Sequence, residues 1–343
     1  MKLVSYIESG EERLGIFNDG KIYNLSENAH AAGEGLLPDN MAEFLMMGEK
    51  AMIIAKNVDR LIKENKSPLI VSHSTPDNLI APVPHPTSCR DGYAFRQHVE
   101  SARRNRKVPM IAEFDQYPVF YFTNHNAIQG PGDVRCMPDH FQKLDFELES
   151  AIVIGKKGRN IRASEADEYI AGYMIMNDIS ARTLQMEEMA LNLGPAKGKD
   201  FSTVIGPWLV TSDELEKYKV QPPSGHEGNN YDLEMVCNVN GKTVSRGNMK
   251  DMSWTYAELI ERCSYGVDIL PGDVIGSGTV GTGCFLELNG TGLLNDPSFK
   301  PQWLQDGDVV EMEITGLGKL TNTIKAEKTN YSLLALKKIT EKI

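Results

Sequence analysis

Carboxylates occupy every second position in residues 144–150, whose sequence is LDFELES. Residues two apart in a β-strand point to the same face, so Asp145, Glu147 and Glu149 would share one face. Residues 151–154 are all apolar, which predicts that the strand continues into a core. Carboxylates crowded at the edge of a core repel one another and lose hydration, and a divalent cation with oxygen ligands relieves both effects. The stretch indicates a metal site or, as the alternative, a solvated strand face.

A further candidate ligand stands at the end of a buried strand predicted for residues 172–178. Polar groups where a buried strand ends are typical of sites carried on a rigid scaffold, so Asp178 could join Glu147 and Glu149 on a cation. The alternative is that Asp178 caps a helix expected from Ser180 onward.

His98 is a candidate for proton transfer, because imidazole side chains exchange protons near neutral pH. The pattern of residues 90–104 predicts a helix that begins near Asp91. Positions seven apart lie on one helix face, which would place Asp91 and His98 on the same side. The alternative is an ordinary amphipathic helix in which Asp91 is an N-cap and His98 is a packing residue.

Two parts of the chain are expected to position these residues. Strands at 2–7, 13–17 and 21–23 and a helical stretch at 40–65 predict a small α+β N-terminal domain, residues 1–77. Closely spaced prolines from Pro68 to Pro86 favour extended backbone, which places the domain boundary near residue 78.

Residues 78–343 are expected to form a strand-rich second domain. The pattern predicts a hairpin at 233–244, a helix at 254–263 and a late strand at 307–315, with a short helix at 165–171. Strands without regular intervening helices argue against a doubly wound α/β fold.

Composition restricts the classes of partner. The net charge of −11 argues against a nucleic-acid partner, and an anionic substrate would need local cations in its pocket. Five scattered cysteines without a CxxC pair are typical of reduced thiols in a cytoplasm. No apolar run reaches the length of a membrane span, and the N-terminus lacks the apolar region of a signal peptide.

Five motifs, in this order, resemble the fumarylacetoacetate hydrolase family from about residue 78 to the C-terminus. They are Asp91-x-Tyr93 with Arg96-Gln97-His98, the acidic stretch 144–149, residues 176–185 (MNDISARTLQ), Gly198-Lys199-x-Phe-x-Thr203, and Ser277-Gly-Thr279 with Phe285-Leu-Glu287. Each motif is weak alone, but the ordered set is specific. The resemblance implies a mixed β-sandwich roll, a dependence on Mg²⁺ (or Ca²⁺ or Mn²⁺) and assembly as a homodimer.

The resemblance also implies roles for individual residues. It implies metal ligands at Asp91, Glu147, Glu149 and Asp178, with Thr203 and Lys199 beside the metal. His98 matches the catalytic base, Glu287 the carboxylate that orients it, and Lys199 the positive charge for a developing oxyanion. Substrate contacts are implied for Tyr93, Tyr121, Arg182, Gln185 and Thr279.

The implied activity is hydrolysis of a C–C bond in a 1,3-diketo acid similar to fumarylacetoacetate or an acylpyruvate, as in aromatic catabolism. Ser101 stands where acylpyruvase and decarboxylase relatives carry a glutamate, which favours the hydrolase branch. The loop from Thr279 to Glu287 is shorter than in fumarylacetoacetase, and residues 104–120 have no clear counterpart. The alternatives are a 2-keto acid decarboxylase, hydratase or isomerase of the same family, and a non-catalytic metal-binding module.

Overall fold

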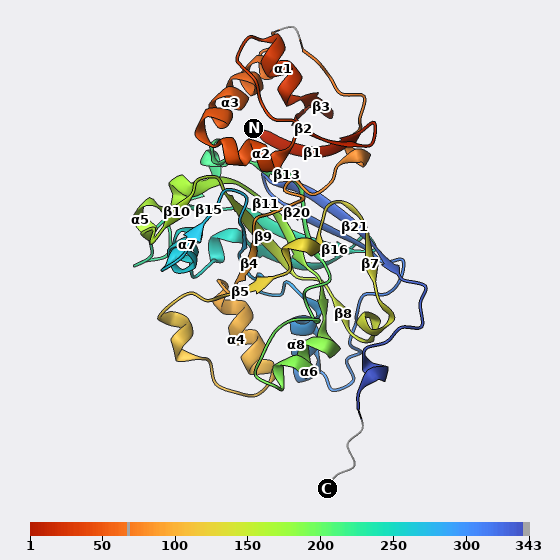
Figure 1. The fold of residues 1–343 in the computed structure, drawn as a ribbon. Helices are drawn as coiled ribbons and strands as arrows, with labels where there is room; N and C mark the ends of the chain where they lie inside the picture. Colours follow the sequence, from red (N-terminus) through yellow and green to blue (C-terminus); the bar gives the residue numbers. More distant parts are fainter. Residues whose placement is uncertain (67–68, 339–343) are drawn as a thin grey trace.

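The computed structural model of the chain describes residues 1–66 and 69–338, so Pro68 of the proline-marked segment lies outside the described residues. The larger sheet has the strand order β3-β2-β1-β13-β11-β9-β19-β4-β5, and β6 pairs with β13. A second sheet has the order β17-β16-β20-β21-β7. Figure 1 shows the N-terminal strands and helices on one side of this body and α4, α6 and α8 on the other.

The N-terminal strands extend the larger sheet, because β1 pairs antiparallel with β13. The elements here are β1 (Lys2–Glu8), β2 (Glu11–Asn18), β3 (Lys21–Asn24), α1 (Leu25–Ala31), α2 (Met41–Met47) and α3 (Glu49–Lys63). The helical stretch expected at 40–65 is confirmed, and it consists of two helices, α2 and α3. Gly48 separates α2 from α3 with a φ of 70°, a conformation that a glycine adopts without strain. The boundary near residue 78 stays a prediction.

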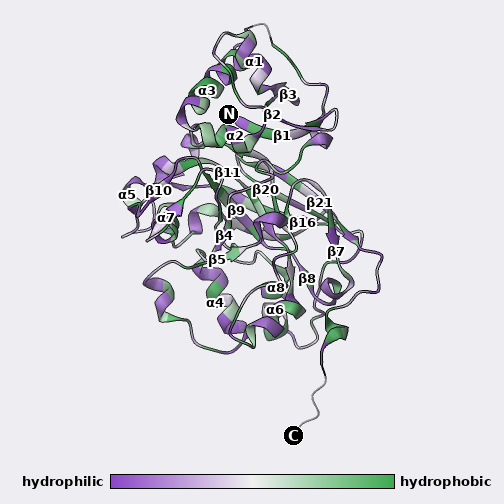
Figure 2. Cartoon of the chain, viewed as in Figure 1, coloured by the Kyte–Doolittle hydropathy of each residue, from purple (hydrophilic) through white to green (hydrophobic). Residues whose placement is uncertain are grey.

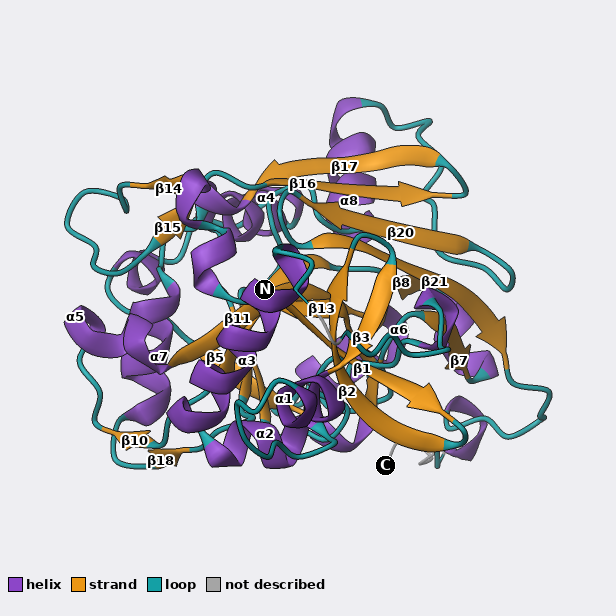
Figure 3. Cartoon of the chain, turned by 90° about the horizontal axis from the view of Figure 1, so that it is seen from above, coloured by secondary structure: helices purple, strands orange, loops and turns teal. Residues whose placement is uncertain are grey.

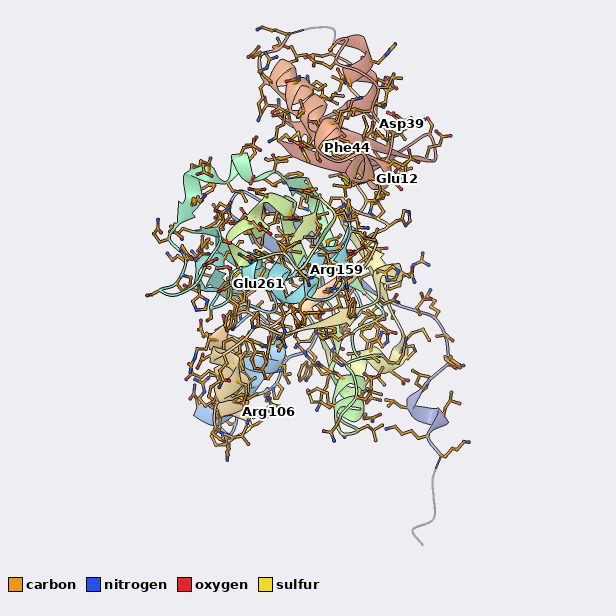
Figure 4. The ribbon with its side chains drawn as sticks, turned by 60° about the vertical axis from the view of Figure 1, so that its left-hand side comes forward. Glu12, Asp39, Phe44, Arg106, Arg159 and Glu261 are labelled. Atoms are coloured by element: carbon orange, nitrogen blue, oxygen red, sulfur yellow. The ribbon has the colours of Figure 1, made fainter. Side chains whose placement is uncertain are left out.

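Apolar periodicity explains how α3 packs. Its buried residues include Ala51, Ile54, Ala55, Val58 and Ile62, spaced three or four apart on one helix face. Figure 2 shows both hydrophilic and hydrophobic segments along α3. The buried face contributes to a core that also contains Phe44 of α2, which is labelled in Figure 4.

The remaining strands of the larger sheet carry Asp91, Tyr121, Glu149, Asp178 and Thr203 of the candidate site. They are β4 (Cys89–Gly92), β5 (Phe120–Thr123), β6 (Ile128–Gln129), β9 (Leu148–Ile154), β11 (Ile170–Asp178), β13 (Thr203–Val210) and β19 (Val274–Gly276). The apolar run 151–154 in β9 is buried on both faces. Ile152 and Ile154 pack in the core shared with the second sheet, whereas Ala151 and Val153 pack in the core shared with α2 and α3.

The second sheet consists of β7 (Gly132–Cys136), β16 (Glu234–Val239), β17 (Lys242–Asn248), β20 (Val309–Ile314) and β21 (Gly318–Ala326). Figure 3 shows β17, β16, β20 and β21 side by side. The hairpin expected at 233–244 is confirmed, with Asn240 and Gly241 both at positive φ in the turn. The late strand expected at 307–315 is confirmed as β20.

Short strands and helices complete the described chain. The short strands pair as β8 (Leu144–Asp145) with β12 (Ser180–Ala181), β10 (Gly158–Arg159) with β18 (Asp268–Ile269), and β14 (Lys219–Val220) with β15 (Asn230–Tyr231). The other α-helices are α4 (Arg96–Asn105), α5 (Ala163–Ala166), α6 (Arg182–Met189), α7 (Tyr256–Ser264) and α8 (Phe285–Asn295). The strand-rich α+β class and the mixed β-sandwich roll are confirmed.

Two local predictions are wrong. The helix expected to begin near Asp91 begins at Arg96, and Asp91 lies in strand β4. The short helix expected at 165–171 is α5 followed by a 3₁₀ turn, and β11 begins at Ile170. None of the helices in the described part of the chain combines the length and the apolar character needed to cross a bilayer.

Candidate active site

Four acidic side chains from neighbouring segments meet at the larger sheet. Oxygen atoms of Asp91, Glu147, Glu149 and Asp178 all lie within 4.8 Å of one another. Asp91 is on β4, Glu149 on β9 and Asp178 at the end of β11, while Glu147 stands in the break between β8 and β9. All four are buried, which excludes the solvated strand face considered from the sequence.

Three of the sequence interpretations are corrected by this arrangement. Asp145 does not join Glu147 and Glu149 in the acidic cluster, and the strand that was expected to align the three is interrupted at residues 146–147. Asp178 does not cap α6, whose N-cap is Ala181. Asp91 does not reach the site along a helix, because it pairs with Gly276 of β19 in a parallel ladder.

Close packing at Gly276 brings Asp91 into the cluster. A Cβ atom on Gly276 would lie 2.4 Å from Oδ1 of Asp91, so only glycine leaves room for this carboxylate. The same Oδ1 accepts a hydrogen bond of 3.0 Å from the backbone N–H of Gly278. The backbone after β19 therefore holds the Asp91 carboxylate toward the other three.

The donor set fits a hard divalent cation. In the described part of the chain, Oε2 of Glu149, Oδ1 of Asp178 and Oγ1 of Thr203 are buried without a hydrogen-bond partner. Thr203 lies beside Asp178 across the β11–β13 ladder. Buried polar atoms are normally paired, and oxygen-only donors are those that Mg²⁺ and Ca²⁺ prefer. This cluster could hold a metal ion.

Burial and mutual repulsion hold part of the cluster in its protonated form when no cation is bound. Burial, reinforced by Asp178, raises the pKa of Asp91 to about 7. Burial and the charges of Asp91, Glu147 and Asp178 raise the pKa of Glu149 well above its usual range. A bound dication would favour the ionised forms that these groups resist.

Two buried cations hold Glu147 in its ionised form. Lys199 Nζ donates to Glu147 Oε2 and, over 2.6 Å, to Asp178 Oδ2. Arg182 Nη2 donates to Glu147 Oε1 over 2.7 Å. Burial opposes ionisation of Glu147, but the two cations outweigh it and lower the pKa of this carboxyl to about 2. Burial disfavours the charge on Lys199, yet Asp178 and Glu147 raise the pKa of its ammonium above the usual value.

The four other side chains for which the family resemblance implied substrate contacts lie around this cluster. The Tyr121 hydroxyl donates to Asp178 Oδ2, and the Thr279 hydroxyl donates to Glu149 Oε1 over 3.3 Å. Gln185 Oε1 accepts from Arg182 Nη1 over 3.0 Å. Tyr93 packs edge-on against the His98 ring, with centroids 5.9 Å apart.

His98 and Glu287 form a buried pair beside the carboxylates. His98 Nδ1 lies 2.7 Å from Glu287 Oε2, and both residues are buried. His98 comes from the first turn of α4 and Glu287 from the first turn of α8, two helices that pack together. With Nδ1 bound to the carboxylate, Nε2 remains for a reacting group, which is the orientation a general base needs.

The His98–Glu287 pair and the acidic cluster both open onto one cavity of about 540 Å³. Its walls include most of the side chains proposed from the sequence, namely Asp91, Tyr93, His98, Tyr121, Glu147, Arg182, Gln185, Lys199, Thr279 and Glu287. Glu149, Asp178 and Thr203 are fully buried and are not part of the lining. A molecule in this cavity would meet carboxylates, fixed cations and an imidazole at once.

Sequence reasoning missed three residues near the site. Arg106 at the C-terminus of α4 lines the cavity. Figure 4 shows Arg106 far from Phe44, which belongs to the N-terminal helices. Asn105 donates to the backbone carbonyl of Glu287 over 3.0 Å, and its spacing of seven from His98 on α4 could have indicated a shared face. Cys284 lies beside His98 and Glu287, and nothing in its sequence spacing indicated that position.

Comparison with known proteins identifies the family. Residues 87–325 match the model of the fumarylacetoacetate hydrolase C-terminal domain. The chain belongs to the fumarylacetoacetate hydrolase family. Its members are enzymes, and the resemblance stated from five motifs is thereby confirmed.

Curated relatives extend over most of the chain. The human mitochondrial oxaloacetate tautomerase FAHD2A is 31% identical over 309 residues, which cover 90% of this chain and 85% of that protein. The Xenopus laevis mitochondrial oxaloacetate tautomerase is 32% identical over 330 residues, or 94% of this chain and 90% of that protein. Among solved structures, a fumarylacetoacetate hydrolase from Exiguobacterium antarcticum has a TM-score of 0.68 at 26% identity and covers 95% of this chain and all of its own.

Proposed function

We propose that this chain is a divalent-cation-dependent enzyme that interconverts the keto and enol forms of a 2-keto dicarboxylic acid such as oxaloacetate. The observation that carries the proposal is the 2.7 Å pair of His98 and Glu287, which faces the same cavity as the acidic cluster. Relatives that are 31–32% identical over nine-tenths of the chain are named oxaloacetate tautomerases, which supports this substrate class.

The acidic cluster would hold the cation through Asp91, Glu147, Glu149 and Asp178, with Thr203 beside them. When bound, Mg²⁺, Ca²⁺ or Mn²⁺ would supply positive charge that polarises a keto oxygen.

The chain's own side chains would then move the proton and bind the acid. His98 would take or return a proton at the carbon next to the keto group through Nε2, and Glu287 would stabilise the charged ring. Lys199 and Arg182 supply fixed positive charge where an enolate oxygen develops, in a site that is otherwise acidic. Tyr93, Tyr121, Gln185 and Thr279 would contact the substrate.

Hydrolysis of a C–C bond in a 1,3-diketo acid is the second candidate. The same His98–Glu287 pair favours it, because a base oriented by a carboxylate is how many hydrolases activate water. Both reactions involve an enolate, so the site could serve either, and the products distinguish them.

The test follows the absorbance of enol-oxaloacetate after mixing with the purified protein and Mg²⁺. We expect faster loss of the enol than in buffer, with total oxaloacetate conserved. No acceleration would rule out tautomerisation. Cleavage of acylpyruvates or fumarylacetoacetate into two acids, without tautomerase activity, would establish the hydrolase in its place.

Three further proposals concern the protein's surroundings. Assembly as a homodimer is checked by sedimentation of the purified protein. A role in aromatic catabolism depends on the hydrolase candidate. A cytoplasmic location is proposed from the unpaired cysteines, whereas several relatives are named as mitochondrial, so fractionation of the source cells decides between them.

A further inference from the structure

Asp145 is a fully buried carboxylate that belongs to the acidic motif but not to the acidic cluster. It lies in the two-residue strand β8, which pairs with β12 directly before α6. Asp145 thus lies between the acidic cluster and α8, and its contacts on both sides indicate what its charge does there.

Backbone N–H groups of α8 surround this carboxylate. Oδ1 accepts from the N–H of Phe285 over 2.7 Å, and Oδ2 accepts from the N–H of Leu286 over 2.9 Å. These are the first two residues of the helix, whose N–H groups have no partner within it. A negative charge at this end is also favoured by the helix dipole. Asp145 thus caps α8 from a distant part of the chain.

The helix has only a weak cap of its own. Its N-cap residue is Cys284, and the Cys284 sulfur accepts from the N–H of Glu287 over 3.4 Å. A cysteine sulfur is a poor acceptor compared with the oxygen of serine or aspartate. The direction in which the first turn of α8 presents Glu287 therefore depends on Asp145.

The same carboxylate fixes Arg182. Oδ2 of Asp145 accepts from Arg182 Nε over 2.9 Å and lies 2.8 Å from Nη2. Nη2 also donates to Glu147. A continuous chain of contacts joins the acidic cluster, through Arg182 and Asp145, to the helix that carries Glu287.

We propose that Asp145 is a positioning residue that holds α8 and Arg182 in register, so that Glu287 meets His98 while Arg182 meets Glu147. The structural part of this inference stands on the contacts alone, and its kinetic part rests on the proposed function. Every partner of the two oxygens is an N–H donor, so the site is built for a carboxylate.

Asp145→Asn tests the structural part without any assay of activity. The amide keeps the size of the side chain but turns an N–H₂ group toward existing N–H donors, which forces them apart. In a crystal structure of the variant, we expect the distance from His98 Nδ1 to Glu287 Oε2 to open from 2.7 Å to beyond about 3.5 Å, where a hydrogen bond no longer exists. An unchanged distance would overturn the proposal, whatever reaction the enzyme catalyses.

A second variant separates the two roles of Asp145. Cys284→Ser, added to Asp145→Asn, gives α8 a stronger N-cap of its own but does not replace the partner of Arg182. We expect Asp145→Asn to lower kcat about 10- to 100-fold and to raise KM, and the double variant to recover kcat but not KM. Loss of thermal stability with unchanged kcat and KM per folded molecule would indicate a purely structural residue and would overturn the kinetic part.

Asp273→Asn is the matched control. Asp273 is also a buried aspartate that accepts from an arginine, Arg90, and from a backbone N–H, that of Leu270, and none of its side-chain hydrogen bonds in the described part of the chain goes to α8. We expect this variant to lose thermal stability and to keep both the His98–Glu287 distance and kcat. A wild-type protein without activity on any 2-keto acid would refute the proposed function, while the distances in the crystals would still decide the role of Asp145.

Discussion

Asp91→Asn in the metal-free protein should make the chain more stable at pH 8, although it alters a buried residue of the site. In the folded wild type, burial and the neighbouring Asp178 raise the pKa of Asp91 from 3.8 to about 7. The folded state therefore binds a proton that the unfolded state has already released over that interval. The contribution of Asp91 to the free energy of unfolding of the wild type therefore falls as pH rises from about 4 to about 7. Outside this interval the contribution does not change with pH.

The magnitude follows from the size of the shift. A difference of about three pKa units corresponds to about 4 kcal/mol above pH 7, because each unit is worth about 1.4 kcal/mol. Asparagine cannot ionise, and its Oδ1 can still accept from the N–H of Gly278 as the aspartate does. The variant should therefore match the wild type near pH 4 and exceed it by up to about 4 kcal/mol at pH 8.

The assay is urea unfolding in excess chelator at pH 4.5, 6 and 8, followed by the same series in Mg²⁺. Cation at well above 1,000 times the wild-type Kd should reverse the order at pH 8. The wild type binds the cation more tightly than the variant and gains about 4 kcal/mol by mass action at 1,000 times Kd, which offsets the lead of the variant. A variant that is less stable than the wild type at pH 8 in chelator would show that Asp91 is a structural acceptor and not a member of a repelling cluster.

Three further outcomes follow from the site. Chelator should abolish activity, and Mg²⁺ or Mn²⁺ should restore it; full activity in excess chelator would contradict a role for the cation. His98→Ala should lower turnover per folded molecule by about 10²–10⁴-fold with metal affinity nearly unchanged, and it should also lower the melting temperature, because the buried Glu287 carboxyl loses its partner. Glu287→Gln should lower turnover less, and a wild-type kcat per folded molecule in His98→Ala would falsify the assignment of the base. Lys199→Met should destabilise the metal-loaded protein by about 3–5 kcal/mol, because two buried carboxylates lose a partner. The exposed pair of Lys197 and Asp200 serves as its control, and Lys197→Met should change stability by less than about 1 kcal/mol.

The sequence predicted which residues lie together at the site, but it did not predict which elements carry them or how those elements pack. Alternating carboxylates before an apolar run predicted a cluster at the edge of a core, and Glu147, Glu149 and Asp178 lie together. The family resemblance, which rests on the order of the motifs, implied Asp91 as a further metal ligand. Local periodicity placed Asp91 at the start of a helix, whereas it lies in strand β4. Its strand has only four residues, all buried, so it has neither alternation nor helical spacing by which to recognise it.

Long-range contacts account for the remaining errors. Asp145 has the same spacing as Glu147 and Glu149, but the strand is interrupted at residues 146–147, and the Asp145 carboxylate contacts α8, about 140 positions away in the chain. The contact of His98 with Glu287 spans 189 residues, so it depends on how α4 and α8 pack and on no local signal. The helical stretch at 40–65 was predicted, but the apolar pattern did not indicate that Gly48, at positive φ, divides it into α2 and α3.

The most direct test of the account is a crystal soaked with Mn²⁺ and oxalate, an unreactive analogue of a 2-keto acid enolate. We predict one anomalous peak per chain with oxygens of Glu147, Glu149 and Asp178 within about 2.0–2.6 Å, Asp91 in or next to this set, and oxalate in the cavity facing Nε2 of His98. A peak bound elsewhere, or carboxylates that stay more than about 6 Å apart around it, would contradict the account.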